Sequence, residues 1–267
     1  MRLAYNQAPD LVYWYLDSYA DFNSAQSLQV KEELTKLHTW HRQTQLPAYI
    51  ETLQKVQKLL PSDVTAQTAC AVVDDIRRKL LAVSEQAEPA VGVLADTLRA
   101  AQLKQMERKF EKNNVAFRED YVDAAPKESI VKRYKQTVKR AEMLYGRLDD
   151  KQLAMVTQQV EQSRFNPTLS YSERLRRQQD LVQNLRAVMA NPGPGESTRK
   201  AVRALLERSV NSPNSAYRDY LETMTHEGCK NFTELHNSTS PDQRRKAVQT
   251  ISNYEQNLKV LSTQNKD

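Results

Sequence analysis

Residues 102–117, QLKQMERKFEKNNVAF, decide the fold class. Leu103, Met106 and Phe110 recur at the three- and four-residue spacing of one helix face, while charged side chains occupy the other face. This spacing predicts an amphipathic helix, which must bury its apolar face against other helices.

The same period returns on both sides of this stretch. Further apolar stripes begin at Val30, Leu46, Ala69, Val131, Leu181, Tyr217 and Ala247. No segment alternates with the period of two that marks a half-buried strand. Pro47 and Pro89 are expected to kink or end helices. We therefore predict an all-α protein, an elongated multi-helix bundle of about eight to ten helices, several of them long and proline-kinked.

Composition supports this class. Only 5 of the 267 residues are glycine, against roughly 7% in ordinary proteins. Such a chain has little room for tight β-turns or glycine-rich phosphate loops. It also contains no run of about 18 apolar residues, so a membrane-spanning helix is not expected.

The clearest loop is Asn191-Pro192-Gly193-Pro194-Gly195. Each apolar stripe needs a facing partner, and the linkers are short. We predict a single helical domain over residues 1–267, with a candidate subdomain break at 191–195.

The charge balance is mildly basic, with 39 Lys and Arg against 33 Asp and Glu, a net charge of +6. The basic residues are interleaved with acidic and apolar positions, as on solvated helix faces. A stripe that binds nucleic acid or anionic lipid is the alternative. Nucleic acid is not an expected partner.

Four helix starts share one pattern: a leading residue that is usually apolar, then a residue that is often of a capping type, and Gln three residues after that. They are Phe22-Asn23-Ser24-Ala25-Gln26, Leu98-Arg99-Ala100-Ala101-Gln102, Leu148-Asp149-Asp150-Lys151-Gln152 and Thr239-Ser240-Pro241-Asp242-Gln243. Three of them predict capping boxes, each worth roughly 1 kcal/mol, whereas Arg99 departs from the rule.

Cys70 and Cys229 are far apart in the sequence and form no CxxC pair. The cysteine spacing that is typical of zinc sites and of thioredoxin-type redox sites is therefore absent. One disulfide would close a loop of about 160 residues and stabilise the fold by roughly 4 to 5 kcal/mol. Two unrelated buried thiols are the alternative.

Catalytic motifs are missing from the sequence. His38 and His41 are spaced for one helix face but have no carboxylate nearby, and His226-Glu227 begins a zincin motif in which Lys230 replaces the second histidine. We expect no catalytic, cofactor-binding or metal-binding residues, and no enzyme.

Aromatic residues gather near the N-terminus. The candidate partner-binding residues are Tyr13, Trp14, Tyr15, Tyr19 and Trp40. Such a group can form an exposed recognition surface, or it can plug the core.

Two resemblances follow. The helix starts resemble the L-T-x-x-Q signature of the Spy and CpxP family of periplasmic helical chaperones. Over the whole chain, the sequence is similar to a family of predicted lipoproteins of unknown function in proteobacteria. The segments that carry this second similarity include Tyr13-Trp14-Tyr15-Leu16-Asp17, Trp40-His41-Arg42, Leu46-Pro47-Ala48-Tyr49, Lys112-Asn113-Asn114 and His236-Asn237-Ser238-Thr239.

The second resemblance implies a location. Its members are periplasmic lipoproteins of the cell envelope, anchored at the outer membrane through a lipid on an N-terminal cysteine. The sequence opens at Met1-Arg2-Leu3 instead, so we expect the lipid-bearing segment to lie outside it. An oxidising periplasm would favour a disulfide between Cys70 and Cys229.

The expected function is non-catalytic: adaptor or chaperone-like binding of an envelope protein or an unfolded client. The alternative is a carrier that holds an apolar small ligand or lipid between its helices.

Overall fold

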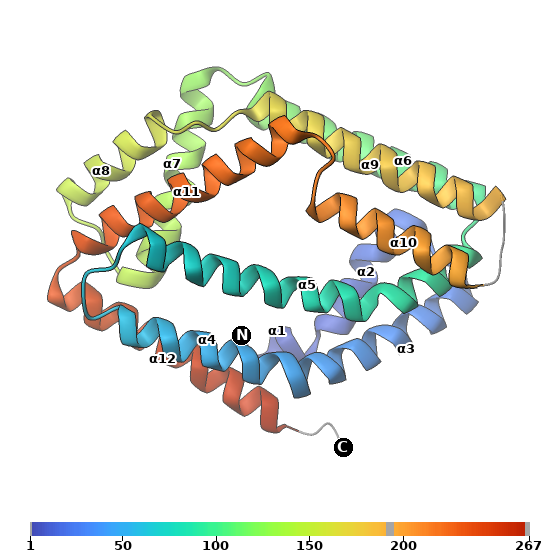
Figure 1. The fold of residues 1–267 in the computed structure, drawn as a ribbon, viewed down its shortest axis with the longest axis horizontal. Helices are drawn as coiled ribbons and strands as arrows, with labels where there is room; N and C mark the ends of the chain where they lie inside the picture. Colours follow the sequence, from blue (N-terminus) through green and yellow to red (C-terminus); the bar gives the residue numbers. More distant parts are fainter. Residues whose placement is uncertain (1, 191–194, 265–267) are drawn as a thin grey trace. The chain divides into compact units, whose positions relative to one another are not determined.

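The computed structural model describes residues 2–190 and 195–264, which fold into helices with no strand among them (Figure 1). The helices are α1 (Arg2–Asn6), α2 (Ala8–Ala20), α3 (Ser24–Trp40), the π-helix η1 (His41–Gln45), α4 (Leu46–Leu59), α5 (Ala66–Thr97), α6 (Ala100–Phe117), the π-helix η2 (Arg118–Val122), α7 (Pro126–Tyr145), α8 (Asp150–Glu161), α9 (Pro167–Ala190), α10 (Gly195–Val210), α11 (Ser215–Asn237) and α12 (Pro241–Thr263). The prediction of an all-α fold is confirmed.

The chain forms two compact units, each assembled from three separate stretches. The first unit contains Met1–His41, Leu81–Val122 and Asn166–Arg218, and the second contains Arg42–Leu80, Asp123–Phe165 and Asp219–Asp267. The prediction of one domain over residues 1–267 stays a prediction. Of the candidate break at 191–195, all but Gly195 lies outside the described residues.

The two prolines act differently. Pro47 is the second residue of α4, and the π-helix η1 directly precedes that helix, so the chain stays helical across the proline with a local change of winding. Pro89 lies inside α5 without ending it, and the helix continues to Thr97. Of the two outcomes expected at Pro89, a kink or a helix end, the helix end is therefore wrong.

Several of the predicted apolar stripes contribute to the cores, but Val131, the first residue of one stripe, is exposed. In the first unit, Leu103 and Met106 of α6 are buried, with Phe110 packed beside them, against a group from α5, α9 and the linker between α5 and α6. The buried members of that group are Ala95, Leu98, Val182, Leu185 and Val188. The second unit has two clusters, one of Leu148, Val156, Val160 and Leu235 and one of Leu60, Tyr145 and Ala247.

Candidate functional site

The glutamines of the recurring helix starts meet in pairs. In the first unit, Nε2 of Gln102 donates to Oε1 of Gln26 at 2.8 Å, and Nε2 of Gln26 donates back to Gln102 at 3.2 Å. Gln26 also donates to the carbonyl of Thr97, and Gln102 to that of Ala20, both at 2.9 Å. Gln26 therefore caps the end of α5, the helix before that of Gln102. In return, Gln102 caps the end of α2, the helix before that of Gln26.

The second unit repeats this arrangement. Gln152 and Gln243 exchange two hydrogen bonds of 2.8 Å each. Gln152 donates to the carbonyl of Ser238 at 3.2 Å, and Gln243 donates to that of Arg147 at 3.0 Å. The pairing was missed at the sequence level, although the repeated position of Gln was its visible signal.

The three predicted capping boxes are confirmed. The side chains of Asn23, Asp149 and Ser240 accept from the backbone N–H of the glutamine three residues later. At Arg99 the guanidinium has no acceptor atom, so only the reciprocal bond forms, from the Arg99 N–H to Gln102 Oε1 at 3.0 Å. All four glutamines thus serve structure.

The candidate aromatic residues separate into internal and surface positions. Tyr13 is buried, donates to Ser27 Oγ at 2.9 Å and lies 4.4 Å, ring centroid to Nζ, from Lys31. Trp40 is partly buried. Trp14 and Tyr15 stay on the surface, with exposed fractions of 63% and 62%.

Tyr19 links this surface to the core of the first unit. Its hydroxyl accepts from Asn113 Nδ2 at 2.7 Å, and its ring packs 5.6 Å from that of Phe110, centroid to centroid. Burial, followed by the neighbouring Tyr15, raises the pKa of Tyr19 to about 12. The phenol is therefore neutral at physiological pH.

An exposed apolar strip runs along α2. Leu11, Trp14 and Tyr15 have the i, i+3, i+4 spacing of one helix face and are all exposed. We call these three residues the α2 face. Tyr19 follows Tyr15 by one helical turn, and Nζ of Lys109 in α6 lies 5.5 Å from its ring centroid. The face combines aromatic surface with a neighbouring positive charge.

Each unit also contains an apolar groove. The larger, of about 480 Å³, lies in the second unit between the end of α4, the start of α5 and α11. Its walls include Leu60, Val72, Val73, Met224 and Phe232. We call it the disulfide groove because Cys229 lines it. The other, of about 400 Å³, lies in the first unit and includes Leu16, Val30, Leu34, Leu37 and Leu94.

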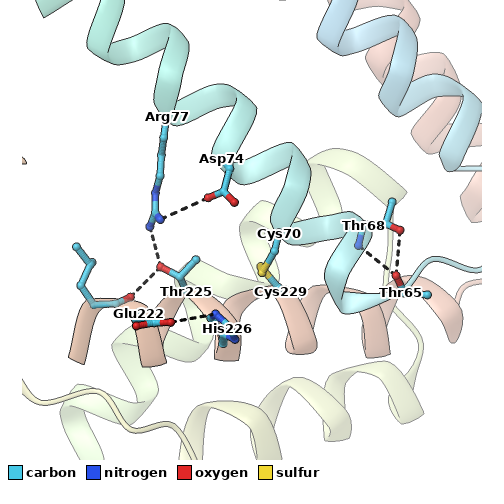
Figure 2. The surroundings of a disulfide bond; sticks show 10 residues. Thr65, Thr68, Cys70, Asp74, Arg77, Glu222, Thr225, His226 and Cys229 are labelled. Atoms are coloured by element: carbon cyan, nitrogen blue, oxygen red, sulfur yellow. Dashed lines mark hydrogen bonds and ion pairs between the residues drawn. A yellow bond between two sulfur atoms is a disulfide. The ribbon is translucent and has the colours of Figure 1, made fainter. Parts of the chain in front are cut away.

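Cys70 of α5 and Cys229 of α11 form a disulfide with a Cα–Cα distance of 5.4 Å (Figure 2). Of the two alternatives for the cysteines, the bonded one is correct. Such bonds persist in oxidising, extracytoplasmic compartments. Among the described helices, none has the length and apolar character needed to cross a membrane.

The histidines serve hydrogen bonding. His38 donates from Nε2 to the carbonyl of Tyr5 at 3.0 Å, and the Tyr5 hydroxyl lies 2.9 Å from Nδ1 of His41. Burial, and then His38, lower the pKa of His41. Within residues 2–190 and 195–264, no three His, Cys, Asp or Glu side chains are grouped to hold a metal ion.

The buried carboxylates are occupied by cationic partners. Glu173 accepts from Arg176, Arg177 and Ser212. Burial raises the pKa of Glu173, but these hydrogen bonds outweigh it, so the net change is a lowered pKa. A carboxylate held ionised in this way has no proton to donate and is a poor general base, because catalysis favours a pKa near the working pH.

A model of a protein family matches residues 18–218, and its description is a family of unknown function. No curated protein and no solved structure matches the chain.

Proposed function

The chain belongs to the DUF6279 family, whose function is unknown, and we propose that it is a non-catalytic binding protein of the bacterial cell envelope. In this proposal an envelope protein or an unfolded client docks on the α2 face, so that the protein acts as an adaptor or a chaperone.

The observation that carries the proposal is the joint exposure of Trp14 and Tyr15. Both rings are more than half exposed, on consecutive residues, with Leu11 exposed beside them. Tryptophan and tyrosine bring large apolar area with little conformational entropy, and tryptophan, tyrosine and arginine dominate the energetics of protein interfaces. A partner that covers them gains this area without any rearrangement of α2.

The proposed location is the periplasm, with a lipid anchor to the outer membrane. The disulfide supports an oxidising compartment, and the similarity to predicted lipoproteins supports the anchor. Fractionation of cells that express the full-length gene product, combined with labelling by a radioactive fatty acid, tests both. Recovery of an unlabelled protein from the cytoplasm would contradict this location.

The chaperone form is tested by light scattering from an aggregating model client. Wild-type protein at stoichiometric excess should suppress aggregation, and the Trp14→Ala/Tyr15→Ala variant should lose most of this effect. Met143→Ala is the matched control, because Met143 is a similarly exposed apolar side chain of the second unit. Lack of suppression by wild type excludes the chaperone form.

The adaptor form is tested by a photoreactive amino acid placed at position 14 or at position 143 in living cells. A discrete adduct that forms from position 14 and not from position 143 supports a dedicated partner. Equal labelling from both positions contradicts docking on the α2 face.

The second candidate function is that of a carrier of an apolar ligand. It is favoured by the disulfide groove, whose volume of about 480 Å³ falls in the range of roughly 300 to 1,000 Å³ found for small-molecule sites.

A further inference from the structure

We infer that the disulfide groove binds an anionic amphiphile with a single acyl chain, whose chain lies against Gly228 and whose acidic head meets Arg77. This inference rests on the second candidate function, the apolar carrier, and is independent of the α2 face.

Gly228 is the first observation. It lies well inside α11 (Ser215–Asn237), where glycine weakens a helix relative to alanine. At Gly92 of α5, an added Cβ would lie 3.2 Å from Cγ of Arg199, so close packing explains that glycine. At Gly228, a Cβ would have no neighbour within 4 Å beyond the adjoining residues and the backbone of its own helix. Close packing therefore does not explain the glycine at 228, and the position opens onto the groove, where only a side chain larger than alanine would reach far into it.

The walls around Gly228 are apolar and held in place. Val72 and Val73 of α5 line the groove together with Met224 and Phe232 of α11. The bond between Cys70 and Cys229 joins these two helices covalently (Figure 2). A groove whose walls are fixed before binding costs little ordering entropy when a ligand enters.

The chemistry of the walls favours an acyl chain over a peptide. An extended peptide carries an N–H and a C=O at each residue, and each needs a hydrogen-bonding partner when it is buried. The described lining offers polar side chains only at Thr68, Arg77 and Thr225. The helical backbone has already used its own N–H and C=O groups. A hydrocarbon chain has no N–H or C=O group and therefore needs no hydrogen-bonding partner in the groove.

Arg77 supplies the site for the head. It is the single charged residue among those that line the groove. Its guanidinium donates to Thr225 Oγ1 at 2.7 Å and lies 3.9 Å from the Asp74 carboxylate (Figure 2). Both members of that long ion pair are about half exposed, so their attraction is weak. The five N–H donors of a guanidinium leave capacity for a carboxylate or phosphate.

The test is isothermal titration of the full, oxidised chain with dodecanoate, dodecyl phosphate, dodecanol and dodecyltrimethylammonium, each below its micelle concentration. We expect both anions to bind about tenfold more tightly than the neutral alcohol, because a charge-assisted hydrogen bond to Arg77 is formed. The cation should bind most weakly. A further titration with a lysophospholipid that has an anionic head distinguishes a lipid source from a free fatty acid.

Three variants locate the site. Gly228→Leu should keep the fold and lower the affinity for dodecanoate at least tenfold, because the side chain fills the groove. Gly228→Ala should raise Tm by about 2 °C through helix propensity and change the affinity little. Arg77→Gln should remove the preference for anions, whereas Arg78→Gln, next to it and more exposed, should preserve that preference.

The outcomes separate the hypotheses. If none of the four amphiphiles binds wild type, both the inference and the carrier function are wrong. If they bind but Gly228→Leu changes nothing, the ligand lies elsewhere, and the inference fails while the carrier function stands. If dodecanol binds as tightly as dodecanoate, the role of Arg77 is wrong.

Discussion

The side-chain amides of Gln152 and Gln243 donate to each other, each Nε2 lying 2.8 Å from the partner's Oε1. Both residues also accept from the backbone N–H of their own N-cap, Asp149 or Ser240. Two helix starts that are far apart in the sequence are thereby joined through one amide pair, and Gln26 with Gln102 joins two others in the first unit.

Replacement of a paired glutamine should be costly. Gln152 is almost fully buried, so Gln152→Ala removes both bonds of the amide pair and takes away the acceptor of the Asp149 N–H and the donor to the Ser238 carbonyl. We expect a loss of about 2 to 4 kcal/mol in the free energy of unfolding, measured by urea denaturation. Gln158→Ala, at an exposed position of the same helix, should be nearly neutral. Equal stability of the two variants would show that the pair contributes nothing.

Removal of the disulfide should lower stability by about 4 to 5 kcal/mol, because the bond closes a long loop in the unfolded chain. Cys70→Ser/Cys229→Ser should show this loss in urea denaturation. Wild type with a strong reductant should then unfold at the same urea concentration as the variant without it. A reductant effect that persists in the variant would point to a cause other than this bond.

Stability should fall as the pH is lowered from 7 to 5, in part because of His236. Its Nε2–H donates to the carbonyl of Ser62, so Nδ1 accepts from the Tyr145 hydroxyl, both at 2.9 Å. Burial lowers the pKa of His236 below its ordinary 6.5. The unfolded chain then binds more protons than the native protein as the pH falls below 6.5. His41 in the first unit acts in the same direction.

The measurement is the urea midpoint between pH 5 and 7 for wild type and for His236→Gln. The variant should be less stable at pH 7 but should lose less stability on acidification. Asp75 and Glu255, whose hydrogen bonds to lysine hold their pKa at about 2, contribute stability that is lost only at lower pH, so they do not obscure this range. Identical slopes for both proteins would contradict the role of His236.

The buried carboxylate of Glu173 should matter far more than an exposed one. Glu173→Ala leaves Arg176, which is mostly buried, without its bidentate partner, and a loss of about 3 to 5 kcal/mol is expected. Glu196→Ala removes an exposed pair with Lys200 and should cost less than about 0.5 kcal/mol. Urea denaturation of the two variants distinguishes these effects. A small loss at Glu173 would mean that water replaces the carboxylate.

The sequence by itself determined the elements of this protein. The helical period of Leu103, Met106 and Phe110, and the caps at Asn23 and Asp149, depend on residues at most a few positions apart. Local patterns of this kind can be recognised from one amino-acid sequence. The local rule left two outcomes open at Pro89, a kink or a helix end, and α5 continues through Pro89 to Thr97.

Only the tertiary structure decided which distant residues meet. Gln152 pairs with Gln243, and Cys70 with Cys229 across 159 residues. It also decided that Tyr13 is buried while Trp14 is exposed. These outcomes depend on which helix faces pack together. An amphipathic pattern predicts that one face of a helix is buried, but it does not predict which other helix covers that face.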